Sequence, residues 1–453
     1  MSQDNNECIR VAIVGAGIVG CALAVSLNAL DTDHKIAIDL YETAPELSEI
    51  GAGLNMWPRT WEIMKKIGLK DTLIPTFDHY PDLENRVVFE VRKSDQKNGY
   101  KVTDIMKEGG VLRIHRADLQ RSLIKHLPLP DSGNPINSAC TLHLSHRLVD
   151  YTTSDSGPTT LHFSNQPDQT CDILIGADGI KSTIRQLFLS RQPNPEDFQQ
   201  YMDARWSGAV IYRGILAKDE LAKVYPGHRA LDHAGLMYTG KNKHTVVYPI
   251  AEKFINVVVT IHGKENDGKL WDGPWNTEVS ATEFYEQFAG WDEEFQALIH
   301  CIKRPTKWAV QKLKNLPVYA KNRVFLMGDA AHAMVPHQGA GAGIGIEDAY
   351  TLAALLTHPS TTPGFTTEYI DKVASIYNAV RVPRAHSMSN GSSRQGYLYA
   401  FETEGFEQYK EGEDIPMDKM LESFREAGEN WSWTATDPDD DTRKAVELLE
   451  GRA

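Results

Sequence analysis

The apolar positions at the start of the chain change from strand-like to helical spacing and back. Residues 10–14 are rich in valine and isoleucine and hardly alternate, which predicts a strand buried on both faces of a parallel sheet. After the glycines that follow, Ala22, Val25 and Ala29 recur at helical spacing, and residues 35–41 predict a second strand. The start of the chain therefore predicts a strand–helix–strand unit.

The middle of the chain has a different pattern. Residues 80–110 alternate apolar and polar positions around a turn-forming segment, which predicts antiparallel strands, and residues 113–125 predict an amphipathic helix. Strand-like runs continue from about 200 to 310, and helical spacing runs from residue 346 to the end. The whole pattern predicts an α/β protein with an inserted antiparallel sheet and C-terminal helices.

Composition narrows the classes of function. The 453 residues are 41% hydrophobic and 24% charged, ordinary values for a globular chain of two or three domains. A net charge of −14 argues against a nucleic-acid-binding protein and against one that binds an anionic membrane. The five cysteines form no CxxC pair and no zinc-ligand spacing, which predicts a cytoplasmic protein without a metal site. The acidic run at 437–441 is interpreted as a solvated turn.

The apolar run from Ile9 to Leu30 has the length of a signal peptide or a membrane span. The residues before it are acidic, whereas a secretory signal begins with basic residues, and three glycines interrupt it. We therefore expect a soluble protein that binds no membrane.

The run VAIVGAGIVG at 11–20 joins the first predicted strand to its helix. Gly15 permits a tight turn, Gly17 lets the backbone approach a pyrophosphate, and Gly20 lets helix and strand pack closely. Glu42 follows the second strand, at the place where a carboxylate accepts both ribose hydroxyls and repels a 2′-phosphate. These residues predict a site for a dinucleotide whose adenosine is not phosphorylated.

Two more motifs follow, CDILIGADGIKSTIR at 171–185 and VFLMGDAAHAMVPHQGAGAGIGIEDA at 324–349. The three motifs in this order resemble the single-component, FAD-dependent aromatic hydroxylases, the family of para-hydroxybenzoate and salicylate hydroxylases. With the YRG at 212–214, the third motif is most similar to fungal salicylate-hydroxylase-like enzymes. The resemblance covers nearly the whole chain and implies FAD as the cofactor.

The resemblance also implies the fold and its division. We expect a Rossmann-like FAD-binding domain with an inserted antiparallel β-sheet substrate domain and C-terminal helices. The implied FAD-binding domain comprises residues 1–80, 111–190 and 320–390, the substrate-binding domain 81–110 and 191–319, and the C-terminal helical segment 391–453.

Residues that contact FAD are implied by the same motifs. Gly53 would lie beside the flavin, Arg116 would contact the cofactor, and Asp178 would serve the pyrophosphate and transient NAD(P)H binding. Asp329 matches an aspartate on the ribityl or ribose oxygens. The glycine loop opens a helix whose N–H groups and dipole suit an anionic reduced flavin. Its residues in this chain are Gly341, Ala342 and Gly343.

The implied reaction uses NADH or NADPH to reduce FAD, after which dioxygen forms a flavin hydroperoxide that attacks an electron-rich phenolic ring. The expected partners are therefore a small aromatic substrate, dioxygen and NAD(P)H. The expected assembly is a monomer or a homodimer.

Three side chains are candidates for catalysis. Arg213 is a permanent cation in the apolar run 208–216 and would stabilise a phenolate or pair with a substrate carboxylate, unless it forms an interdomain salt bridge. Tyr248 would donate a hydrogen bond to the substrate or else pack in the core, with Tyr238 as a weaker competitor. His337 would relay the phenol proton or merely order the loop.

Other interpretations remain open at this point. A redox-silent FAD-binding protein would carry the same motifs, and so would a flavin-dependent reductase or halogenase of the same fold. Halogenases need a WxWxIP stretch, whereas the WxW at 431–433 is followed by Thr434 and Ala435. Consumption of NAD(P)H stimulated by phenols distinguishes a hydroxylase from the redox-silent protein.

Overall fold

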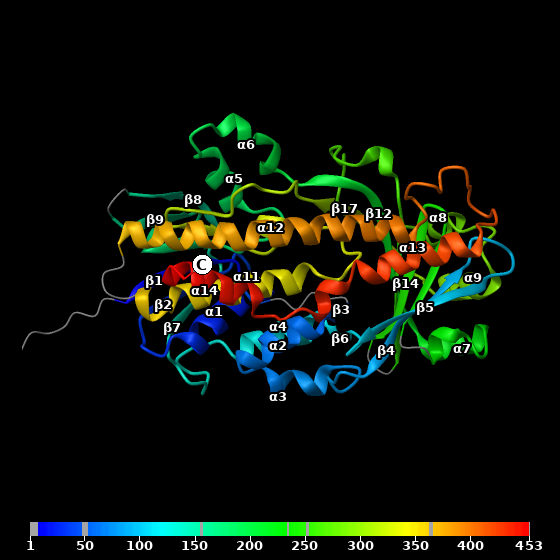
Figure 1. Ribbon diagram of the computed structural model, residues 1–453, viewed down its shortest axis with the longest axis horizontal. Coiled ribbons are helices and arrows are strands. Elements are labelled where there is room, and N and C mark those ends of the chain that lie inside the picture. Colours follow the sequence, from blue (N-terminus) through cyan, green and yellow to red (C-terminus); the bar gives the residue numbers. More distant parts are fainter. Residues whose placement is uncertain are drawn as a thin grey trace, which may run out of the picture.

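The computed structural model describes residues 8–47, 53–154, 157–232, 235–250, 253–361 and 366–452. Two lobes lie end to end along the molecule, and the long helix α12 (Thr367–Tyr399) spans both of them (Figure 1). Each lobe is built on its own sheet, so a site between the lobes can take side chains from both.

The first lobe contains a six-stranded sheet in the order β18-β19-β11-β1-β2-β7. All its neighbouring strands are parallel except β18 and β19. The predicted strand–helix–strand unit is confirmed, because helix α1 (Ile18–Leu30) connects the two adjacent parallel strands β1 and β2. The strands are β18 (Ala320–Lys321), β19 (Val324–Leu326), β11 (Ile173–Gly176), β1 (Ile9–Val14), β2 (Ile36–Tyr41) and β7 (Ala139–His143).

Helix α1 lies very close to the sheet and to helix α11 (Gly341–Leu356). A β-carbon on Gly20 would lie 1.9 Å from the carbonyl oxygen of Gly15, and one on Gly345 would lie 2.5 Å from Cγ2 of Val19. Only glycine fits at either position. The packing role predicted for Gly20 therefore has a steric basis in the fold.

The second lobe contains an eight-stranded sheet in the order β16-β17-β12-β15-β14-β13-β4-β5. It is antiparallel except for the parallel pair β13 and β4, in agreement with the predicted inserted sheet. The strands are β16 (Asn276–Glu278), β17 (Thr306–Lys312), β12 (Arg205–Ala217), β15 (Phe254–Ile261), β14 (Lys243–Ile250), β13 (Leu236–Gly240), β4 (Asn85–Lys93) and β5 (Tyr100–Glu108).

One face of the second sheet is covered by helices α7 (Lys218–Val224), α8 (Ala281–Glu286) and α9 (Glu293–His300). Leu221, Phe284 and Phe295 from these helices pack with Leu216 and Val257 of the sheet in one buried apolar cluster. The opposite face is turned toward the first lobe and carries the side chains of the candidate site. The strands of the two sheets come from the segments expected for the two domains, and the domain boundaries themselves remain a prediction.

A short two-stranded sheet connects the lobes. Strand β3 (Gly53–Met56) pairs with strand β6 (Leu112–His115), which leads directly into helix α4 (Arg116–Lys125). The helix predicted over 113–125 therefore begins three residues later than expected, because residues 113–115 belong to strand β6 and pair with β3. The remaining small sheet has the order β10-β9-β8, with strands β10 (Gln169–Cys171), β9 (Thr159–Phe163) and β8 (Leu148–Thr152).

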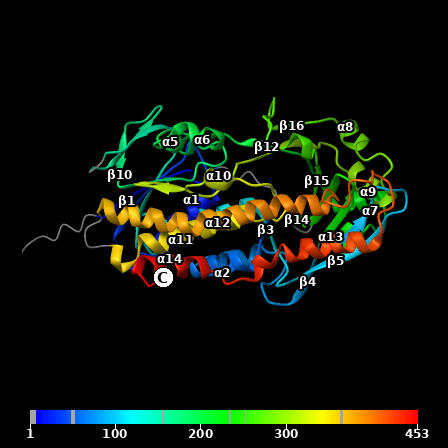
Figure 2. The same cartoon turned by 45° about the horizontal axis from the view of Figure 1, so that its top comes forward.

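Two helices near the end of the chain pack against both lobes (Figure 2). Helix α13 (Met417–Glu429) lies on strand β5 and on α12, and α14 (Asp440–Glu450) packs against α11 and α12. The other helices are α2 (Pro58–Lys66), α3 (Lys70–Leu73), α5 (Thr183–Ser190), α6 (Pro195–Met202) and α10 (Asp329–His332). Among the described residues, no helix is both long and apolar enough to cross a membrane.

A buried network of charges fixes the C-terminal helices to α11. Arg381 of α12 binds Asp348 at 2.8 Å, Glu347 at 3.3 Å and Asp441 of α14 at 2.5 Å. Arg59 of α2 binds Glu347 at 2.6 Å. The run 437–441 is thus not simply a solvated turn, since its last carboxylate neutralises a buried arginine.

Candidate FAD and substrate site

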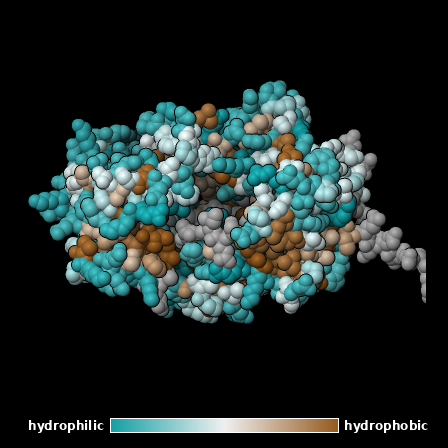
Figure 3. All heavy atoms as spheres, turned by 180° about the vertical axis from the view of Figure 1, so that it is seen from behind, coloured by the Kyte–Doolittle hydropathy of each residue, from teal (hydrophilic) through white to brown (hydrophobic). Residues whose placement is uncertain are grey.

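A cavity of about 1040 Å³ lies between the two lobes, and the molecule is visibly hollowed there when seen from behind (Figure 3). On one side it is lined by the start of α1, by strand β3 and by the loop 334–340 that leads into α11. On the other side it is lined by strands β12, β14 and β15 of the second sheet. The three sequence motifs and the inserted sheet therefore face the same space.

The first glycine turn leaves a helix N-terminus open toward this cavity. Gly15 has φ +108°, and a β-carbon there would lie 2.4 Å from the carbonyl oxygen of Ala177. Gly17 precedes α1 without a side-chain cap, lines the cavity, and has open space where a β-carbon would be. The unpaired N–H groups at this helix start can bind an anionic group.

Glu42 follows strand β2 beside the same turn. Its carboxylate oxygens accept hydrogen bonds from the N–H groups of Ala16 at 3.1 Å and Ala44 at 2.8 Å. These bonds fix the carboxylate at the end of the strand, while each oxygen keeps a lone pair for another donor. Glu42 does not itself line the cavity, and its role of holding ribose hydroxyls remains a prediction.

The third motif supplies a second open helix N-terminus. Helix α11 begins at Gly341 without a side-chain cap, and both Gly341 and Ala342 line the cavity. Gly343 does not line it, because its α-carbon faces α2, where a β-carbon would lie 2.6 Å from Thr60 Oγ1. Two of the three predicted loop residues therefore face the cavity, and the third allows close packing of α11 on α2.

The two predicted aspartates lie in different settings. Asp329 begins α10, is exposed and lines the cavity. Asp178 is partly buried, accepts a hydrogen bond from the Ile184 N–H at 3.1 Å, and keeps an Oδ1 atom without a partner among the described residues. Burial raises the pKa of Asp178. Asp178 itself does not line the cavity, although its neighbours Ala177 and Gly179 do.

Gly53 and Arg116 also line the cavity, from strand β3 and from the start of α4. A β-carbon on Gly53 would lie 2.5 Å from Cε2 of Tyr248, so strand β3 touches the second sheet at this point. Arg116 is exposed, which leaves its charge available at the cavity wall.

Arg213 lies on strand β12 with its side chain directed into the cavity. Among the described residues, none accepts a hydrogen bond from its buried Nε atom. Its guanidinium lies 5.4 Å from the centre of the Trp308 ring. Burial lowers the pKa of Arg213, and the nearby charge of Arg116 lowers it further. The alternative of an interdomain salt bridge has no support, because the described residues give Arg213 no ion-pair partner.

Tyr248 lines the cavity from strand β14, and its hydroxyl donates to the carbonyl oxygen of Gly53 at 3.3 Å. Burial raises its pKa, while Arg213 and Arg113 lower it in part. Tyr238 is not a cavity residue, because it packs behind the sheet and its hydroxyl donates to Glu294 at 3.2 Å. Of the two tyrosines, only Tyr248 faces the predicted substrate site.

His337 lies in a group of three histidines. His244 and His337 line the cavity, and His262 Nε2 lies 3.2 Å from His244 Nδ1. The His337 ring centre is 5.2 Å from that of His244 and 5.3 Å from that of His262. Burial lowers the pKa of all three, that of His262 to about 4. All three imidazoles are therefore neutral at pH 7.

Comparisons with known proteins agree with this arrangement. The model of the FAD binding domain family matches residues 8–364. A salicylate hydroxylase from Pseudomonas putida is 34% identical over 405 residues, which cover 88% of this chain and 87% of that protein. The chain belongs to this family of FAD-dependent aromatic hydroxylases.

Two further proteins are similar to this hydroxylase over almost its whole length. The 6-methylsalicylate 1-monooxygenase of Aspergillus terreus is 29% identical over 464 residues, covering 97% of this chain and 92% of that one. A solved salicylate hydroxylase in complex with substrate has a TM-score of 0.80 at 30% identity and covers 98% of this chain and 99% of its own. The predicted family and its Rossmann-like fold with an inserted sheet are confirmed.

The residues of this hydroxylase fit its cofactor, FAD. Two uncapped helix N-termini, at Gly17 and Gly341, open onto one cavity, and the positions of their missing β-carbons are empty. Glu42 stands beside the first of them and Asp329 faces the cavity. An anionic dinucleotide needs such donors together with acceptors for its sugar hydroxyls.

Two cavity residues, and a third residue behind them, were missed by the sequence analysis. His244 and Asn256 line the wall formed by β14 and β15, and His262 lies directly behind His244. Asn256 is buried, and its Nδ2 atom has no hydrogen-bond partner among the described residues. Their strands were predicted, and alternation from Tyr248 would have placed His244 on the same face.

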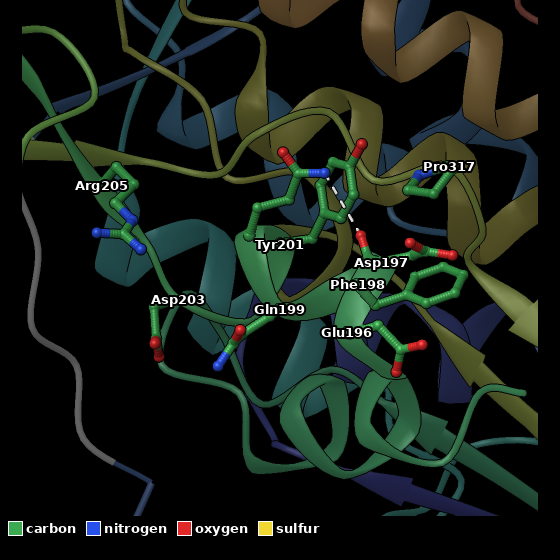
Figure 4. Close-up of a pocket in the computed structure, with 9 residues that line it drawn as sticks. Glu196, Asp197, Phe198, Gln199, Tyr201, Asp203, Arg205 and Pro317 are labelled. Atoms are coloured by element: carbon green, nitrogen blue, oxygen red, sulfur yellow. Dashed lines mark hydrogen bonds between the residues drawn. The ribbon is translucent and has the colours of Figure 1, made fainter. Parts of the chain in front are cut away.

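A second hollow lies at helix α6 on the surface of the first lobe (Figure 4). Its wall includes the carboxylates Glu196, Asp197 and Asp203, and it contains none of the predicted site residues. Within the part of the chain that the structure describes, no group of histidine, cysteine and carboxylate side chains could hold a metal ion. The chemistry of this hydroxylase is therefore assigned to the cavity between the lobes.

Proposed function

We propose that this hydroxylase acts on an electron-rich phenol, either salicylate-like or a resorcylic polyketide, and that Arg213, Tyr248 and His337 form its substrate site. By their names, the similar enzymes from P. putida and A. terreus act on salicylate and 6-methylsalicylate. The observation that carries the proposal is the unpaired cation of Arg213 inside the cavity.

Arg213 is half-buried and has no ion-pair partner among the described residues, which is unfavourable because its surroundings only partly replace the solvation that the charge loses. The lowered pKa of Arg213 reflects this burial and the proximity of Arg116. A carboxylate or phenolate on the substrate would supply the missing negative charge in a charge-assisted hydrogen bond. A phenolate is also the more electron-rich form of the ring, so the same contact would favour both binding and reaction.

His337 is proposed to take the phenol proton. Its pKa is lowered by burial, by His262 and by Lys312, so its ring is neutral and has a free lone pair at pH 7. The three clustered imidazoles cannot all become protonated, because a second positive charge would face the first at close range. The cluster is thus suited to accept a single proton from one substrate hydroxyl.

Bound FAD, once reduced by NADH or NADPH, supplies the activation of dioxygen. The contribution of the protein is to hold the ring and to keep water away from it. Tyr248 closes the contact between strands β3 and β14, and its oxygen retains lone pairs that can accept a hydrogen bond from the substrate hydroxyl.

We also propose that NAD(P)H binds only transiently, as Asp178 and its motif imply. A cytoplasmic monomer or homodimer is the proposed form of the protein. The odd number of cysteines without CxxC spacing supports a reducing compartment.

The proposal is tested by a panel of phenols that includes salicylate, orsellinate-type acids and resorcylic ketones. NADH and NADPH oxidation, peroxide release and product mass are followed in parallel on the FAD-loaded protein. We expect NAD(P)H oxidation to rise with at least one anionic phenol and the product to gain one oxygen atom. If the protein contains flavin but no phenol increases the rate at which NAD(P)H reduces it, the redox-silent alternative is favoured instead.

A further inference from the structure

The cavity extends beyond Arg213 toward solvent along strand β12. Side chains alternate along this strand, so Ile211, Arg213, Ile215 and Ala217 share the face that lines the cavity. The intervening Tyr212 is buried in the cluster that packs on the helices behind the sheet, and Leu216 belongs to the same cluster although it also borders the cavity. One continuous row of side chains thus leads from the unpaired cation to the end of β12.

Exposure increases along this row. Ile211 is 3% exposed, whereas Ile215 is 55% exposed although it lines the same cavity. On the neighbouring strand β15, Asn256 pairs with Ile215 and is 2% exposed, and Phe254 pairs with Ala217 and is 47% exposed. The cavity therefore opens at this end, over an apolar surface.

A single exposed isoleucine needs no explanation, since apolar atoms form much of any protein surface. Here, however, the exposed side chain lines the same cavity as Arg213, a cavity of about 1040 Å³ that FAD and the substrate share. Beside it, the buried Nδ2 atom of Asn256 has no hydrogen-bond partner among the described residues. The side chain of Asn256 lies beside Tyr248, where it offsets part of the rise that burial causes in the pKa of that tyrosine.

The rim of this opening carries charged side chains of both signs. Lys303 and Arg304 line it, both exposed, and Arg304 is paired with Glu278 at 2.7 Å. Glu220 of α7 lines the same region. An anionic ring with an apolar chain would match a cation at the inner end and an apolar floor.

We propose that the natural substrate carries, besides its phenolic ring, an apolar side chain that lies over Ile215 and Ala217 and is joined to the ring through an oxygen-bearing group bound by Asn256. This inference rests on the proposed function, because it assumes that the ring itself is held near Arg213. The expected substrate is an alkyl ketone or similar acyl derivative of a phenol, larger than salicylate.

The first test compares two resorcylic substrates, one bare and one with a six-carbon acyl chain, in the FAD-loaded enzyme. A fully buried CH₂ group is worth roughly a fourfold gain in binding, and less at an open mouth. We expect kcat/KM to favour the acyl substrate at least tenfold, and Ile215→Glu to reduce this ratio at least fivefold. Val224→Glu is the matched control, since Val224 is 61% exposed on α7, outside the cavity lining, and its change should leave the ratio unaltered.

The second test concerns the linking oxygen. We expect the enzyme to prefer the acyl substrate to the corresponding alkyl substrate, and Asn256→Leu to reduce this preference by about tenfold, the usual effect of one hydrogen bond to a buried donor. Asn256→Asp, which replaces the amide donor with an acceptor, should reduce it as well.

The dissociation constants of the same ligands are measured from changes in the flavin spectrum, so the inference is tested even without turnover. The inference is overturned if the acyl and bare substrates are bound and turned over equally well by the unaltered enzyme, or if Ile215→Glu leaves their ratio unchanged. The hydroxylase assignment stands in either case. An effect of Ile215→Glu on the KM for NAD(P)H alone also overturns it and assigns the opening to the coenzyme. If no phenol binds or reacts, the proposed function fails together with this inference.

Discussion

The hydroxyl of Tyr248 donates a hydrogen bond to the carbonyl oxygen of Gly53 at 3.3 Å, joining the inserted sheet to the strand beside the cofactor site. The ring of Tyr248 covers the α-carbon of Gly53 so closely that a β-carbon would lie 2.5 Å from Cε2. These two residues are 195 positions apart in the sequence. The contact fixes the separation of the two cavity walls, on which the position of a bound ring depends.

The first prediction concerns this contact. Gly53→Ala should push the tyrosine ring away and widen the cavity, so that the fraction of consumed NAD(P)H recovered as product falls several-fold and peroxide increases. Tyr248→Phe removes only the hydrogen bond, worth about 1 kcal/mol, and should have the smaller effect. Product and peroxide are measured together. If Gly53→Ala forms as much product per NAD(P)H consumed as the unaltered enzyme, this role of the contact is contradicted.

The second prediction concerns Arg213. Removing its charge in Arg213→Ala should leave the protein yellow with bound FAD but lower kcat/KM for an anionic phenol by about a hundredfold, equivalent to roughly 2.7 kcal/mol. Arg213→Lys keeps a charge and should lose less. Arg205 lies on the same strand outside the cavity lining, so Arg205→Ala is a matched control. Loss of FAD from Arg213→Ala would place this arginine in the cofactor site instead.

Many of the residues proposed to bind the cofactor can be predicted from local sequence. Gly15, Gly17 and Gly20 are close together in the chain, and their roles depend on a turn between a strand and a helix that the apolar spacing predicts. The substrate wall was predicted less completely. Strand alternation placed Arg213 on a strand face, but the neighbours of that face come from β14 and β15, whose register with β12 is not visible in the sequence.

The acidic run near the C-terminus shows most clearly what could not be predicted from the sequence. The run 437–441 has the composition of a solvated turn, and its isolated pattern contains no sign of a buried partner. Asp441 binds Arg381, 60 residues earlier, only because α14 packs against α12. Pairings between distant segments are decided by tertiary packing, and neither periodicity nor composition encodes them.

The third prediction concerns Asp329. Because its carboxylate faces the cavity at the start of α10, Asp329→Ala should raise the dissociation constant of FAD at least tenfold, so that the protein is purified with little flavin. Asp329→Asn retains one acceptor oxygen and should bind FAD more tightly than the alanine variant. The ratio of flavin to protein absorbance measures both. A stoichiometric flavin content in Asp329→Ala would count against this contact.

The fourth prediction concerns the network that fixes α12 to α11 and α14. Arg381→Met would leave the buried Asp348 without its arginine and Glu347 with Arg59 as its main remaining cation, which should lower the free energy of unfolding by roughly 3–5 kcal/mol. Arg425→Ala breaks an exposed pair with Glu429 and should cost less than about 1 kcal/mol. Urea unfolding of the two variants gives the comparison, and equal losses would mean that the buried network adds nothing beyond a surface pair.

The last prediction concerns pH and the three histidines. The pKa of His262 is lowered from 6.5 to about 4 by burial, so the unfolded chain takes up a proton in this range while the folded protein does not. Stability is therefore unaffected by this group above pH 6.5 and is lost as the pH falls toward 4, by roughly 1–3 kcal/mol. His262→Gln should remove this part of the acid sensitivity, which unfolding at a series of pH values measures. If the cluster also accepts the phenol proton, the same variant should lower kcat more than it raises KM, whereas a histidine that only packs would leave kcat unchanged.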